Sequence, residues 1–488
     1  MGAVKVLGWL ALSALAPGAA HLRAGWRRTG LVLLSCYAAL LLGLLWTVLT
    51  SGSLASLAGT LVDDASLTTA AVGSAVLGVA WFAMMVHSFV VLRPGSLRQA
   101  EQIVTGTVAG LLTVAVLVPF GATAQYAWTS RDLINSIFKN PTTDPQARQG
   151  EPAPRPEDPW AGRERVNILL LGGDADDHRP GVRTDSMNLA SVDVATGSTV
   201  LISLPRNLEE VRFKPGTPMA ERFPGGFRLP PDPGGGRSDL LNSVWEYSDA
   251  HPEIFGGRRH QGARVLMETI GYTLGLDVDW YALVNMWGFA RLIDAIGGVT
   301  LTVERDVVFG RYNEGLVKAG ARKLKGADAM WYARSRTNSD DYTRMRRQRC
   351  VLGALLDQAD PATVLTRFNQ VAAATKELIQ TDIPRDMLTH LVPLAMKVQQ
   401  AEVTSIQFVP PLINTGSPDW DKIRTLTRKE IRQSTGAAPV VASAGPTATS
   451  TATSTATPTP TPTKSRKKAA QPQEDDPARA LTDGCGQL

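Results

Sequence analysis

Acidic and basic side chains lie where apolar segments end in the middle of the chain. The apolar segment Val166–Leu171 runs into a Gly-Gly-Asp turn that ends at Asp174, and a polar loop with Arg183 and Asp185 follows. A later apolar segment ends at Arg206. Ligand groups in open α/β sheets usually lie at the ends of strands. Carboxylates with guanidinium groups, without a Ser/His or Cys/His pair, favour a phosphate ester held through a hard metal ion.

A second set of such residues lies on a predicted helix further along the chain. Three- and four-residue spacing places three side chains on one face of this helix, with a fourth close to that face. These residues are Asp341, Arg344 and Gln348, with Arg347 as the fourth. The other two arginines of this helix, Arg346 and Arg349, point elsewhere and are expected to be exposed to solvent.

Three sequence blocks, in this order and spacing, resemble the LytR-CpsA-Psr family of cell-wall glycopolymer ligases. Asn167–Asn207 has the family's strand, Gly-x-Asp turn, Arg-x-Asp-x-Met step and strand ending in Pro-Arg. Asp279–Val303 has its strand, helix, Asp, Gly-Gly-Val and strand. Gly326–Arg349 has Tyr-Ala-Arg-x-Arg and then Asp-x-x-Arg-x-x-Arg-Gln. The resemblance covers roughly Arg165 to Val409.

The resemblance implies a phosphotransferase that attaches a glycopolymer from a polyprenyl-pyrophosphate carrier to a muramic acid hydroxyl of peptidoglycan and releases polyprenyl phosphate. A pyrophosphatase acting on the same carrier, and a non-catalytic regulator that binds lipid-linked sugars, are the alternatives. The Ala-, Arg- and Pro-rich composition is typical of a high-GC actinobacterium. The identity of the polymer stays open.

The family motif also implies roles for individual residues. Asp174 and Asp185 match the pair associated with a divalent cation, Mg²⁺ or Mn²⁺, on the lipid pyrophosphate. Catalytic roles fall on Asp185, Arg183, Arg206 and Arg344. Substrate-binding roles fall on Arg334, Arg336, Asp341, Arg347 and Gln348. Asn242 and Asp294 also match family positions, and either could be purely structural, Asp294 by fixing the turn at Gly297-Gly298.

Two positions depart from the family pattern. Asp176 stands where the family commonly has an arginine, which removes one phosphate contact that His178 or Arg179 could replace. Asn207 stands where the family commonly has an aspartate, so a proton-accepting role there is in doubt. No side chain stands out as a general base, which phosphoryl transfer tolerates because it relies mainly on positioning and charge stabilisation.

Long apolar segments precede these motifs. Leu31–Thr50, Ala70–Leu92 and Ile103–Ala124 are each long enough to span a bilayer. Val6–Ala20 is shorter and is expected to be an interfacial or re-entrant helix, or a fourth span. The net charge of +5 and the pI of about 9.1 first suggest nucleic acid as a partner. The membrane segments argue against that partner, because they would place the basic domain outside the cell.

Flanking charges predict the orientation of the three spans. Basic residues precede the first long span, in the range 23–28, and separate the second from the third, in the range 93–98. The loop 51–69 has Asp63 and Asp64 and no Lys or Arg. The positive-inside rule places the basic stretches in the cytoplasm. We therefore predict a multi-pass protein of the cell membrane with an extracytoplasmic C-terminal domain.

Strands and helices are predicted to alternate from Val166 onward, which indicates an α/β domain with a central mixed sheet covered by helices on both faces. The predicted strands are Asn167–Leu171, Met187–Val192, Thr199–Leu204, Tyr281–Val284, Val299–Val303 and Ser405–Val409. The predicted helices are Ser238–Ser248, Ala263–Leu274, Met286–Ala295, Gly326–Tyr332, Tyr342–Gln358, Pro361–Thr375 and Pro384–Val398. Lys214–Arg237, rich in Gly and Pro, is predicted to be a surface loop.

The chain is expected to divide into four parts. An all-α membrane region covers 1–128, an extracytoplasmic spacer 129–164, the catalytic domain 165–432 and an Ala/Ser/Thr/Pro-rich tail 433–488. The repeats in Gly436–Asp476 cannot form a core and are expected to be disordered. Cys350 and Cys485 would share an oxidising compartment, where they could pair or stay as free thiols. The three cysteines include no CxxC motif, so a structural zinc site is not expected.

Overall fold

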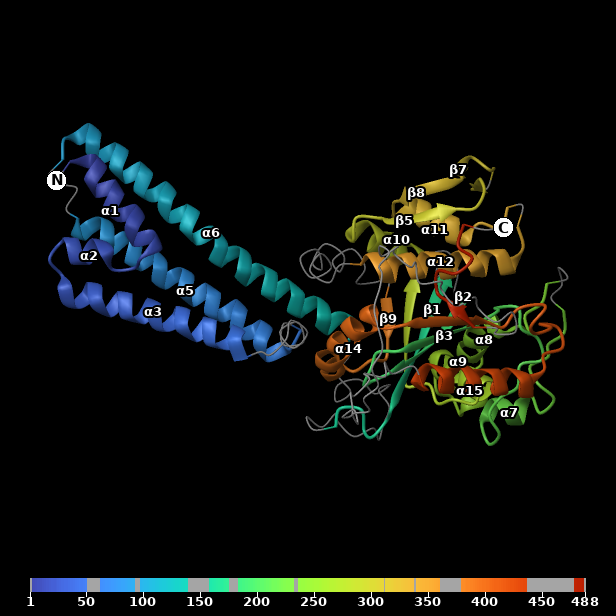
Figure 1. Ribbon diagram of the computed structural model, residues 1–488. Helices are drawn as coiled ribbons and strands as arrows, with labels where there is room; N and C mark the ends of the chain where they lie inside the picture. Colours follow the sequence, from blue (N-terminus) through green and yellow to red (C-terminus); the bar gives the residue numbers. More distant parts are fainter. Residues whose placement is uncertain are drawn as a thin grey trace, which may run out of the picture.

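The computed structural model describes residues 2–50, 62–92, 97–138, 158–174, 183–231, 236–310, 312–337, 339–359, 379–436 and 478–486. They form an elongated helical region at the N-terminal end and an α/β domain, and one long helix runs from the first to the second (Figure 1). The order of the two parts is the one that the sequence predicted.

The helical region contains the predicted membrane segments. Its helices within the described residues are α1 (Ala3–Leu15), α2 (Ala19–Arg23), α3 (Arg27–Thr50), α5 (Asp64–Val91) and α6 (Gln99–Ile137). The last three are long and apolar enough to cross a membrane, with mean hydropathies of 2.0, 1.9 and 2.2. Their outward-facing side chains are apolar too, for example Leu42, Val79 and Leu111. By contrast, α1 spans about 20 Å, less than the bilayer core of about 30 Å.

Helix α6 continues beyond its apolar part and reaches the α/β domain. Its 39 residues extend for about 58 Å, well beyond the thickness of a bilayer core. At the junction, the Asp64 carboxylate pairs with Arg131 of α6 (Nε–Oδ1 2.8 Å) and with Arg385 of the domain (Nη1–Oδ1 2.9 Å). Ile134 and Leu388 share an apolar cluster across the same junction. The helical region is thus joined to the domain by ion pairs and by apolar packing.

The domain is built on one mixed seven-stranded sheet with the order β11-β10-β3-β2-β1-β4-β9. The strands are β1 (Arg165–Asp174), β2 (Arg183–Asp193), β3 (Thr199–Leu204), β4 (Trp280–Asn285), β9 (Ile379–Thr381), β10 (Val403–Gln407) and β11 (Arg479–Ala480). β1 runs parallel to β4, and β3 runs parallel to β10. The other neighbours are antiparallel. The predicted mixed sheet is therefore confirmed.

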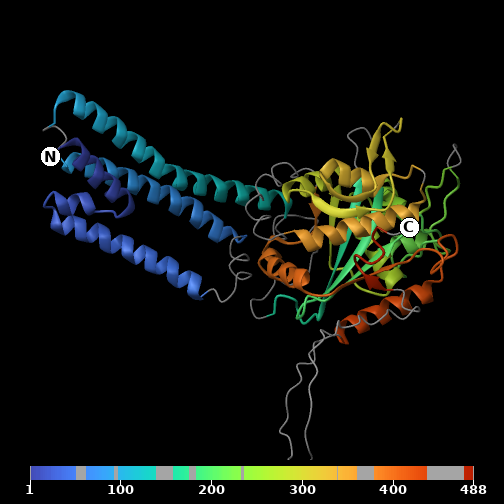
Figure 2. The same cartoon turned by 45° about the horizontal axis from the view of Figure 1, so that its top comes forward.

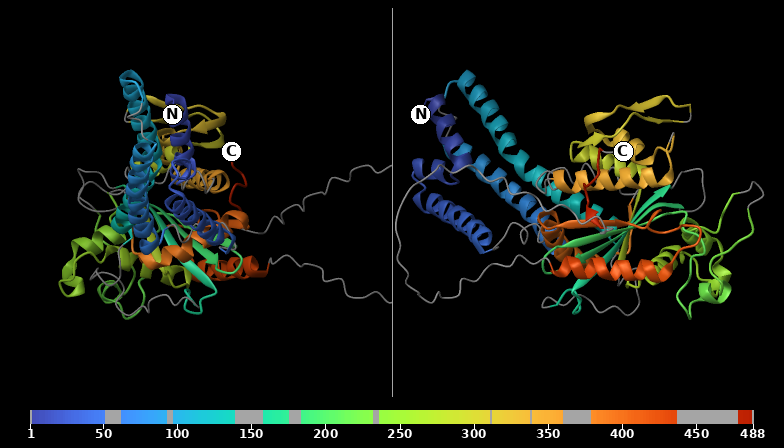
Figure 3. Two further views of the ribbon diagram at one scale, coloured as in Figure 1. Left: turned by 90° about the vertical axis from the view of Figure 1, so that its left-hand side faces the viewer. Right: turned by 45° about the vertical axis from the view of Figure 1, so that its right-hand side comes forward.

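Helices cover both faces of this sheet, as predicted (Figures 1 and 3). One face packs on α8 (Val244–Ala250), α9 (Gly262–Leu274) and α15 (Trp420–Gly436), and the other on α10 (Met286–Ala295), α12 (Asp341–Gln358) and α14 (Leu388–Gln400). Leu169, Leu189 and Ile202 lie opposite one another on neighbouring strands. They form the main core with Leu266 and Ile270 of α9. Alternate residues of the same strands face the layer that contains α12.

A second, smaller core lies beyond α12. Two antiparallel strand pairs form part of it: β5 (Val299–Val303) with β8 (Gly320–Leu324), and between them in the chain the short hairpin of β6 (Val307–Phe309) with β7 (Gly315–Val317). They pack with α10, α11 (Gly326–Arg334) and α12. Figure 2 shows this small lobe above the central sheet. Helix α12 therefore lies between the two cores.

The C-terminal end of the described chain returns to the domain. β11 pairs with β10 at the edge of the sheet, and the buried Leu481 follows it. Cys485 forms a disulfide with Cys350 of α12, which resolves the alternative that the sequence left open. The predicted tail, 433–488, is thus not free at either end, because α15 reaches Gly436 and residues 478–486 pack on the domain. Residues 437–477, where disorder is predicted, lie outside the described residues.

The predicted elements can be compared with the observed ones. Thr199–Leu204, Val299–Val303 and Met286–Ala295 have the predicted bounds, and most others are present with shifted ends. The helix predicted over Ser238–Ser248 begins later, with the 3₁₀ turn η2 (Leu241–Ser243) and then α8. Pro361–Thr375 lies outside the described residues. The prediction did not include α7, α15, β6 to β9 and β11. The predicted spacer, 129–164, begins inside α6, and its residues 139–157 are not described.

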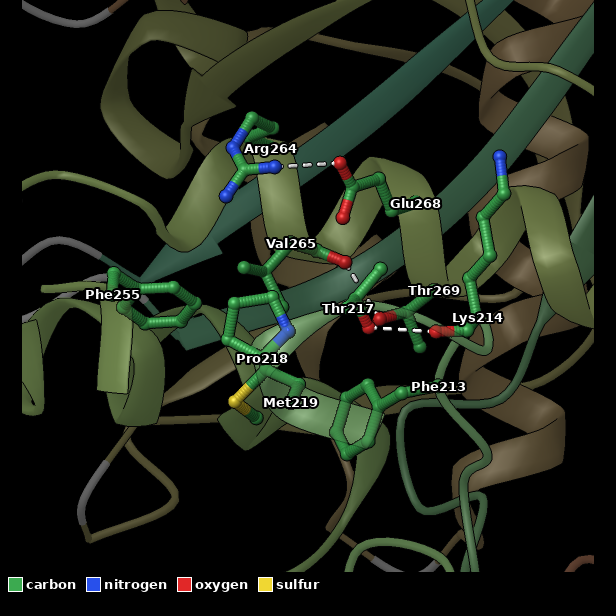
Figure 4. Close-up of a pocket in the computed structure, with 10 residues that line it drawn as sticks. All are labelled: Phe213, Lys214, Thr217, Pro218, Met219, Phe255, Arg264, Val265, Glu268 and Thr269. Carbon is green, nitrogen blue, oxygen red and sulfur yellow. Dashed lines mark hydrogen bonds and ion pairs between the residues drawn. The ribbon is translucent and has the colours of Figure 1, made fainter. Parts of the chain in front are cut away.

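Lys214–Arg237 was predicted to be a surface loop, and this prediction is wrong. The described residues of this segment pack into the domain. It contains α7 (Pro218–Arg222), and its phenylalanines are buried. Phe213, Phe223 and Phe227 contact one another with ring centroids 5.2–6.1 Å apart. Figure 4 shows the start of this segment lining a small cavity against α9. The loop was predicted from the many glycines and prolines of this segment, and its phenylalanines were not recognised as core residues.

Candidate functional site

A β-bulge lies at the start of β2, opposite Gly172 and Gly173 near the end of β1. The pairing of the two strands is regular up to Gly172 opposite Ser186, but Gly173 then lies opposite Thr184. Asp185 is the extra residue between these two pairs. A bulge leaves one residue outside the hydrogen-bond ladder and bends the strand, which changes the direction of its side chain. The bulge therefore positions Asp185 differently from the regular strand that follows it.

Asp185 belongs to a cluster of two carboxylates and three guanidinium groups, here called the acid–arginine cluster. Its carboxylate accepts a hydrogen bond from Nη1 of Arg206, just after β3. Asp341 Oδ1 lies 3.3 Å from Nε of Arg206 and 2.9 Å from Nη2 of Arg344. Arg336 completes the cluster, with its Nε 3.9 Å from the same oxygen. The ends of two strands and the start of α12 thus bring together five of the predicted site residues.

The acid–arginine cluster has an excess of positive charge and donors that lack acceptors. Arg344 is only 2% exposed, and its Nη1 donates to the backbone oxygen of Asp185 at 2.9 Å. The Nε atom of Arg344 is buried without a hydrogen-bond acceptor among the described residues, and that of Arg206 makes no hydrogen bond there beyond its ion-pair contact with Asp341 at 3.3 Å. Burial and the nearby Arg206 and Arg344 lower the pKa of Arg336. Because buried donors without partners are costly, the cluster favours an anion that supplies acceptors.

A small polar cavity lies beside the cluster, between the sheet and α12. Gln348 lines it, one helical turn after Arg344, together with Asp185 and Arg206. Asn188 and Ser203 form its floor and are hydrogen-bonded to each other (Oγ–Oδ1 2.6 Å). Its volume of about 10 Å³ is close to the minimum for one water molecule. The structure therefore places Gln348 in one cavity with Asp185 and Arg206, whereas helical spacing had predicted only that it shares a face with Asp341 and Arg344.

Arg347 has a different environment from Arg344. Its Nε donates to Glu304 at 2.6 Å and its Nη1 to the backbone oxygen of Ser335 at 3.3 Å. Tyr332 donates its hydroxyl to the other oxygen of Glu304, also at 2.6 Å. Burial alone would raise the pKa of Glu304, but the hydrogen bonds from Tyr332 and Arg347 hold it below its ordinary value. In this structure, Arg347 joins α12 to the smaller core rather than to the acid–arginine cluster.

The remaining predicted site residues surround the cluster at greater distance. Arg183 pairs with Glu246 of α8 (Nε–Oε2 2.9 Å). Arg334 lies over the ring of Trp331, with its guanidinium carbon 5.4 Å from the ring centroid. Asp174 ends β1 opposite Arg183. The loop positions Asp176, Asp177, His178 and Arg179, between these two strands, lie outside the described residues.

The prediction that Arg349 is exposed to solvent is wrong. Arg349 is buried, and its Nη2 donates to the backbone oxygen of Asp483 at 2.5 Å. The C-terminal segment that docks beside Cys350 covers it, and helical spacing within α12 could not reveal this contact. Arg346 is half-buried and does not belong to the acid–arginine cluster.

Asn242 and Asp294 have structural contacts. The backbone nitrogen of Asn242 donates to the backbone oxygen of Arg206 at 3.1 Å, which fixes the chain after β3. Asp294 accepts from the backbone nitrogen of Gly326 at 2.8 Å. A Cβ atom at Gly326 would lie 1.9 Å from the backbone oxygen of Ala290. Asp294 therefore holds α11 close against α10, and its backbone oxygen accepts the backbone nitrogen of Gly297 at 3.0 Å, a contact within the Gly297-Gly298 turn where a structural role was predicted.

The divalent cation implied by the family motif can be tested against the donor set. Asp174 and Asp185 lie at the same end of neighbouring strands. The described part of the chain contains no group of three or more His, Cys, Asp or Glu side chains that could hold a metal ion. Magnesium often uses one or two carboxylates and takes its other ligands from substrate phosphates and water. The two aspartates therefore suit such an ion in the presence of a phosphate group.

Sequence reasoning missed three side chains near the site. Glu304 holds Arg347 from a loop with no local motif. Asn188 and Gln407 line the polar cavity from β2 and β10, next to buried apolar residues of the same strands. A polar residue within a buried strand is a signal that could have identified them, because buried polar groups need partners.

Comparisons with known proteins match the part of the chain that contains this site. The model of the LytR_cpsA_psr family matches residues 138–416. A protein of Oceanobacillus iheyensis, named polyisoprenyl-teichoic acid–peptidoglycan teichoic acid transferase TagU, is 29% identical over 232 residues, 47% of this chain and 62% of that protein. The protein of the same name from Halalkalibacterium halodurans is 25% identical over 250 residues, 50% of this chain and 71% of that protein.

Solved structures show the same resemblance at lower identity. A crystal structure of a Streptococcus agalactiae protein is 21% identical, with a TM-score of 0.40, and covers 55% of this chain and 88% of that one. The chain spans 62% of the length of the Oceanobacillus relative. The matched part contains the whole acid–arginine cluster.

Proposed function

Since the chain belongs to the LytR_cpsA_psr family, we propose that it transfers a glycopolymer from a polyprenyl-diphosphate carrier to peptidoglycan. The observation that carries this proposal is the acid–arginine cluster, where Arg206, Arg336 and Arg344 lie around two carboxylates. The names of the relatives, teichoic acid transferases that act on peptidoglycan, support the substrate class.

The proposed reaction exchanges a phosphoanhydride bond for a phosphoester bond. A muramic acid hydroxyl oxygen bonds to the phosphorus that carries the sugar. The bond from that phosphorus to the bridging oxygen breaks, and polyprenyl phosphate leaves with this oxygen. The proton of the hydroxyl passes through water to the departing phosphate. The diphosphate supplies the driving force, so no nucleotide is needed.

The protein contributes mainly position and charge. Arg344 is almost fully buried and is held by Asp341 and by the backbone of Asp185, so its planar fork is fixed before substrate binds. Such preorganised donors stabilise charge that develops on phosphate oxygens. Asp174 and Asp185 would hold Mg²⁺ or Mn²⁺, which would neutralise part of the diphosphate charge. Gln348, beside the cluster, would orient a phosphate oxygen or a water molecule.

The proposed location is the outer face of the cell membrane, with several membrane-spanning helices. The basic residues Arg27 and Arg28 begin α3 and Arg98 precedes α6, at the end of the helical region far from the domain (Figure 1). Asp64 lies at the opposite end, beside the domain. With the basic ends in the cytoplasm, the domain lies outside. An export-dependent reporter fused after Trp160 should be active, and activity of a cytoplasm-dependent reporter there would contradict this orientation.

Product analysis tests the reaction and separates the alternatives. The full chain in lipid nanodiscs is incubated with a polyprenyl-diphosphate glycan, with and without peptidoglycan fragments, and the products are identified by mass spectrometry. We expect a glycan joined through phosphate to a muramic acid, with polyprenyl phosphate released only when the acceptor is present. Equal release without acceptor would indicate a pyrophosphatase. Binding without any release would indicate a non-catalytic regulator.

A further inference from the structure

An open cavity with aromatic walls lies next to the acid–arginine cluster, on the smaller lobe. Its volume is about 240 Å³. Phe309 and Gly310 line it from the β6–β7 hairpin, and Trp331 lines it from α11. The rest of its wall is the segment that follows α11, Arg334–Thr337. The aromatic wall of this cavity has no part in the functional roles described above.

The two aromatic side chains of the cavity are held in a fixed arrangement. The rings of Phe309 and Trp331 are stacked, with centroids 5.1 Å apart and planes within 9° of each other. Gly315 faces Phe309 across the hairpin, and a Cβ atom there would lie 2.1 Å from the Phe309 ring. The absence of a side chain at Gly315 therefore lets the ring lie against the hairpin and reach Trp331.

The polar wall is equally well supported. Ser335 is buried, and its hydroxyl donates to the backbone oxygen of Val308, the neighbour of Phe309. Its backbone oxygen accepts Nη1 of Arg347. The segment between α11 and α12 is thus fixed to the hairpin on one side and to α12 on the other. The cavity is therefore already formed before anything binds, as expected of a binding site.

Arg336 connects this cavity to the acid–arginine cluster. Its guanidinium lines the cavity, and its Nε is 3.9 Å from Asp341 Oδ1. Burial, and repulsion by the nearby Arg206 and Arg344, lower the pKa of Arg336. A group joined to an anion in the cluster would therefore reach the cavity without crossing another part of the protein.

We propose that the cavity between Phe309, Trp331 and Arg336 is a subsite for one sugar ring of the glycan that reacts at the neighbouring phosphate. A pyranose ring has an apolar C–H face that suits aromatic walls, and hydroxyl groups that suit Arg336 and Thr337. Typical pockets for drug-sized ligands measure about 300–1,000 Å³, so this one suits a single ring rather than a longer oligosaccharide. The inference rests on the proposed function, because the phosphate partner defines which glycan is meant.

The ring could belong to the donor or to the acceptor, and binding measurements on the full chain in nanodiscs separate the two. One arm compares a short-chain polyprenyl diphosphate that bears a single N-acetylglucosamine with the same diphosphate without sugar. The other arm uses the disaccharide of N-acetylglucosamine and N-acetylmuramic acid, which has no phosphate. Affinities are measured by calorimetry, so no turnover is required.

Two variants test the walls, and one serves as a matched control. Phe309→Ala removes an aromatic wall, and Thr337→Val removes a hydroxyl at nearly constant volume. Tyr312→Ala removes an aromatic side chain from the same hairpin that is 80% exposed and does not line the cavity. Loss of one ring contact should weaken binding about threefold to tenfold. Thermal melting of each variant checks that it folds. If Phe309→Ala does not fold, Thr337→Val alone tests the subsite.

The expected result is that Phe309→Ala and Thr337→Val weaken binding of one sugar-bearing probe and leave the sugar-free diphosphate unchanged, whereas Tyr312→Ala has no effect. Loss confined to the lipid-linked sugar assigns the ring to the donor, and loss confined to the disaccharide assigns it to the acceptor. Unchanged affinity for both sugars, or an equal loss for the sugar-free diphosphate, would overturn the subsite. If the wild type binds no lipid diphosphate, the proposed function fails, while the disaccharide arm still tests the cavity.

Discussion

Arg344 and Arg347 lie three residues apart on α12, and each is only 2% exposed. Arg344 reaches a cluster in which guanidinium groups outnumber carboxylates, and its Nε has no acceptor among the described residues. Arg347 reaches a closed set in which Glu304 and a backbone oxygen accept its hydrogen bonds, and Tyr332 donates to the other oxygen of Glu304. Burial alone therefore does not distinguish a binding arginine from a structural one. The distinction lies in whether the partners already satisfy the charge.

The largest expected effect concerns the closed set. Arg347→Met would leave Glu304 buried without its partner, and removal of one member of a buried pair typically costs about 3–5 kcal/mol. We expect a large fall in the thermal melting temperature of the full chain. The double variant Arg347→Met/Glu304→Leu should recover most of the stability, because it removes both charges. A stable Arg347→Met protein that has lost diphosphate binding would instead support the family-based role of Arg347 as a substrate ligand.

The next effect concerns the carboxylates of the open cluster. Asp185→Ala removes the partner of Arg206 and one of the two proposed ligands of the cation. Transfer should fall to a small residual rate that depends less on Mg²⁺, with little change in melting temperature, because Asp185 is partly exposed to solvent. Initial rates measured over a magnesium titration check this expectation. Full activity of a folded Asp174→Ala/Asp185→Ala protein would rule out the metal assignment.

Replacement of the guanidinium in the open cluster should have an intermediate effect. Arg344→Lys keeps the charge but loses the planar fork that matches phosphate oxygens. Loss of a charge-assisted hydrogen bond costs about 1.5–3 kcal/mol, or about tenfold to over a hundredfold in turnover. Arg346→Ala, on the same helix but outside the cluster, is the control and should be nearly silent. Equal effects of the two variants would mean that only the overall positive charge matters.

The smallest expected effect is a dependence of stability on pH. The folded pKa of Glu304 is below its ordinary value of 4.5, so its contribution is fully present above that pH. The contribution is lost as the pH falls through the lower folded pKa. As the pH is lowered, the melting temperature of the wild type should therefore fall more steeply than that of Arg347→Met/Glu304→Leu. The same dependence of melting temperature on pH in both proteins would show that the pKa of Glu304 is the same in the folded and unfolded states.

The same two arginines show how far the sequence could predict this molecule. Helical spacing placed Arg344 and Gln348 on one face, and the structure brings both to the start of β2. Spacing also placed Arg347 close to that face, but α12 lies between two cores, and Arg347 points into the smaller one. Its partner Glu304 lies 43 residues away, in a loop that no local pattern connects to α12.

Helix α15 illustrates a second limit. Its residues Ile423, Thr427 and Glu430 are all buried. Because two of these are polar, the apolar residues alone do not show the helical period in the sequence. The strand β9 has only three residues, too few for an alternating pattern to be recognised. By contrast, β3 and α10 have regular patterns and clear ends, and their bounds were predicted correctly.

The disulfide between α12 and the C-terminal segment changes the connectivity of the molecule. Cys350 and Cys485 are 135 residues apart in sequence, so they close a covalent ring that includes β9, α14, β10 and α15. A protease that cuts the chain once between residues 437 and 477 would open this ring without releasing either piece. The cut protein should migrate as one species on a denaturing gel and separate into two only after reduction.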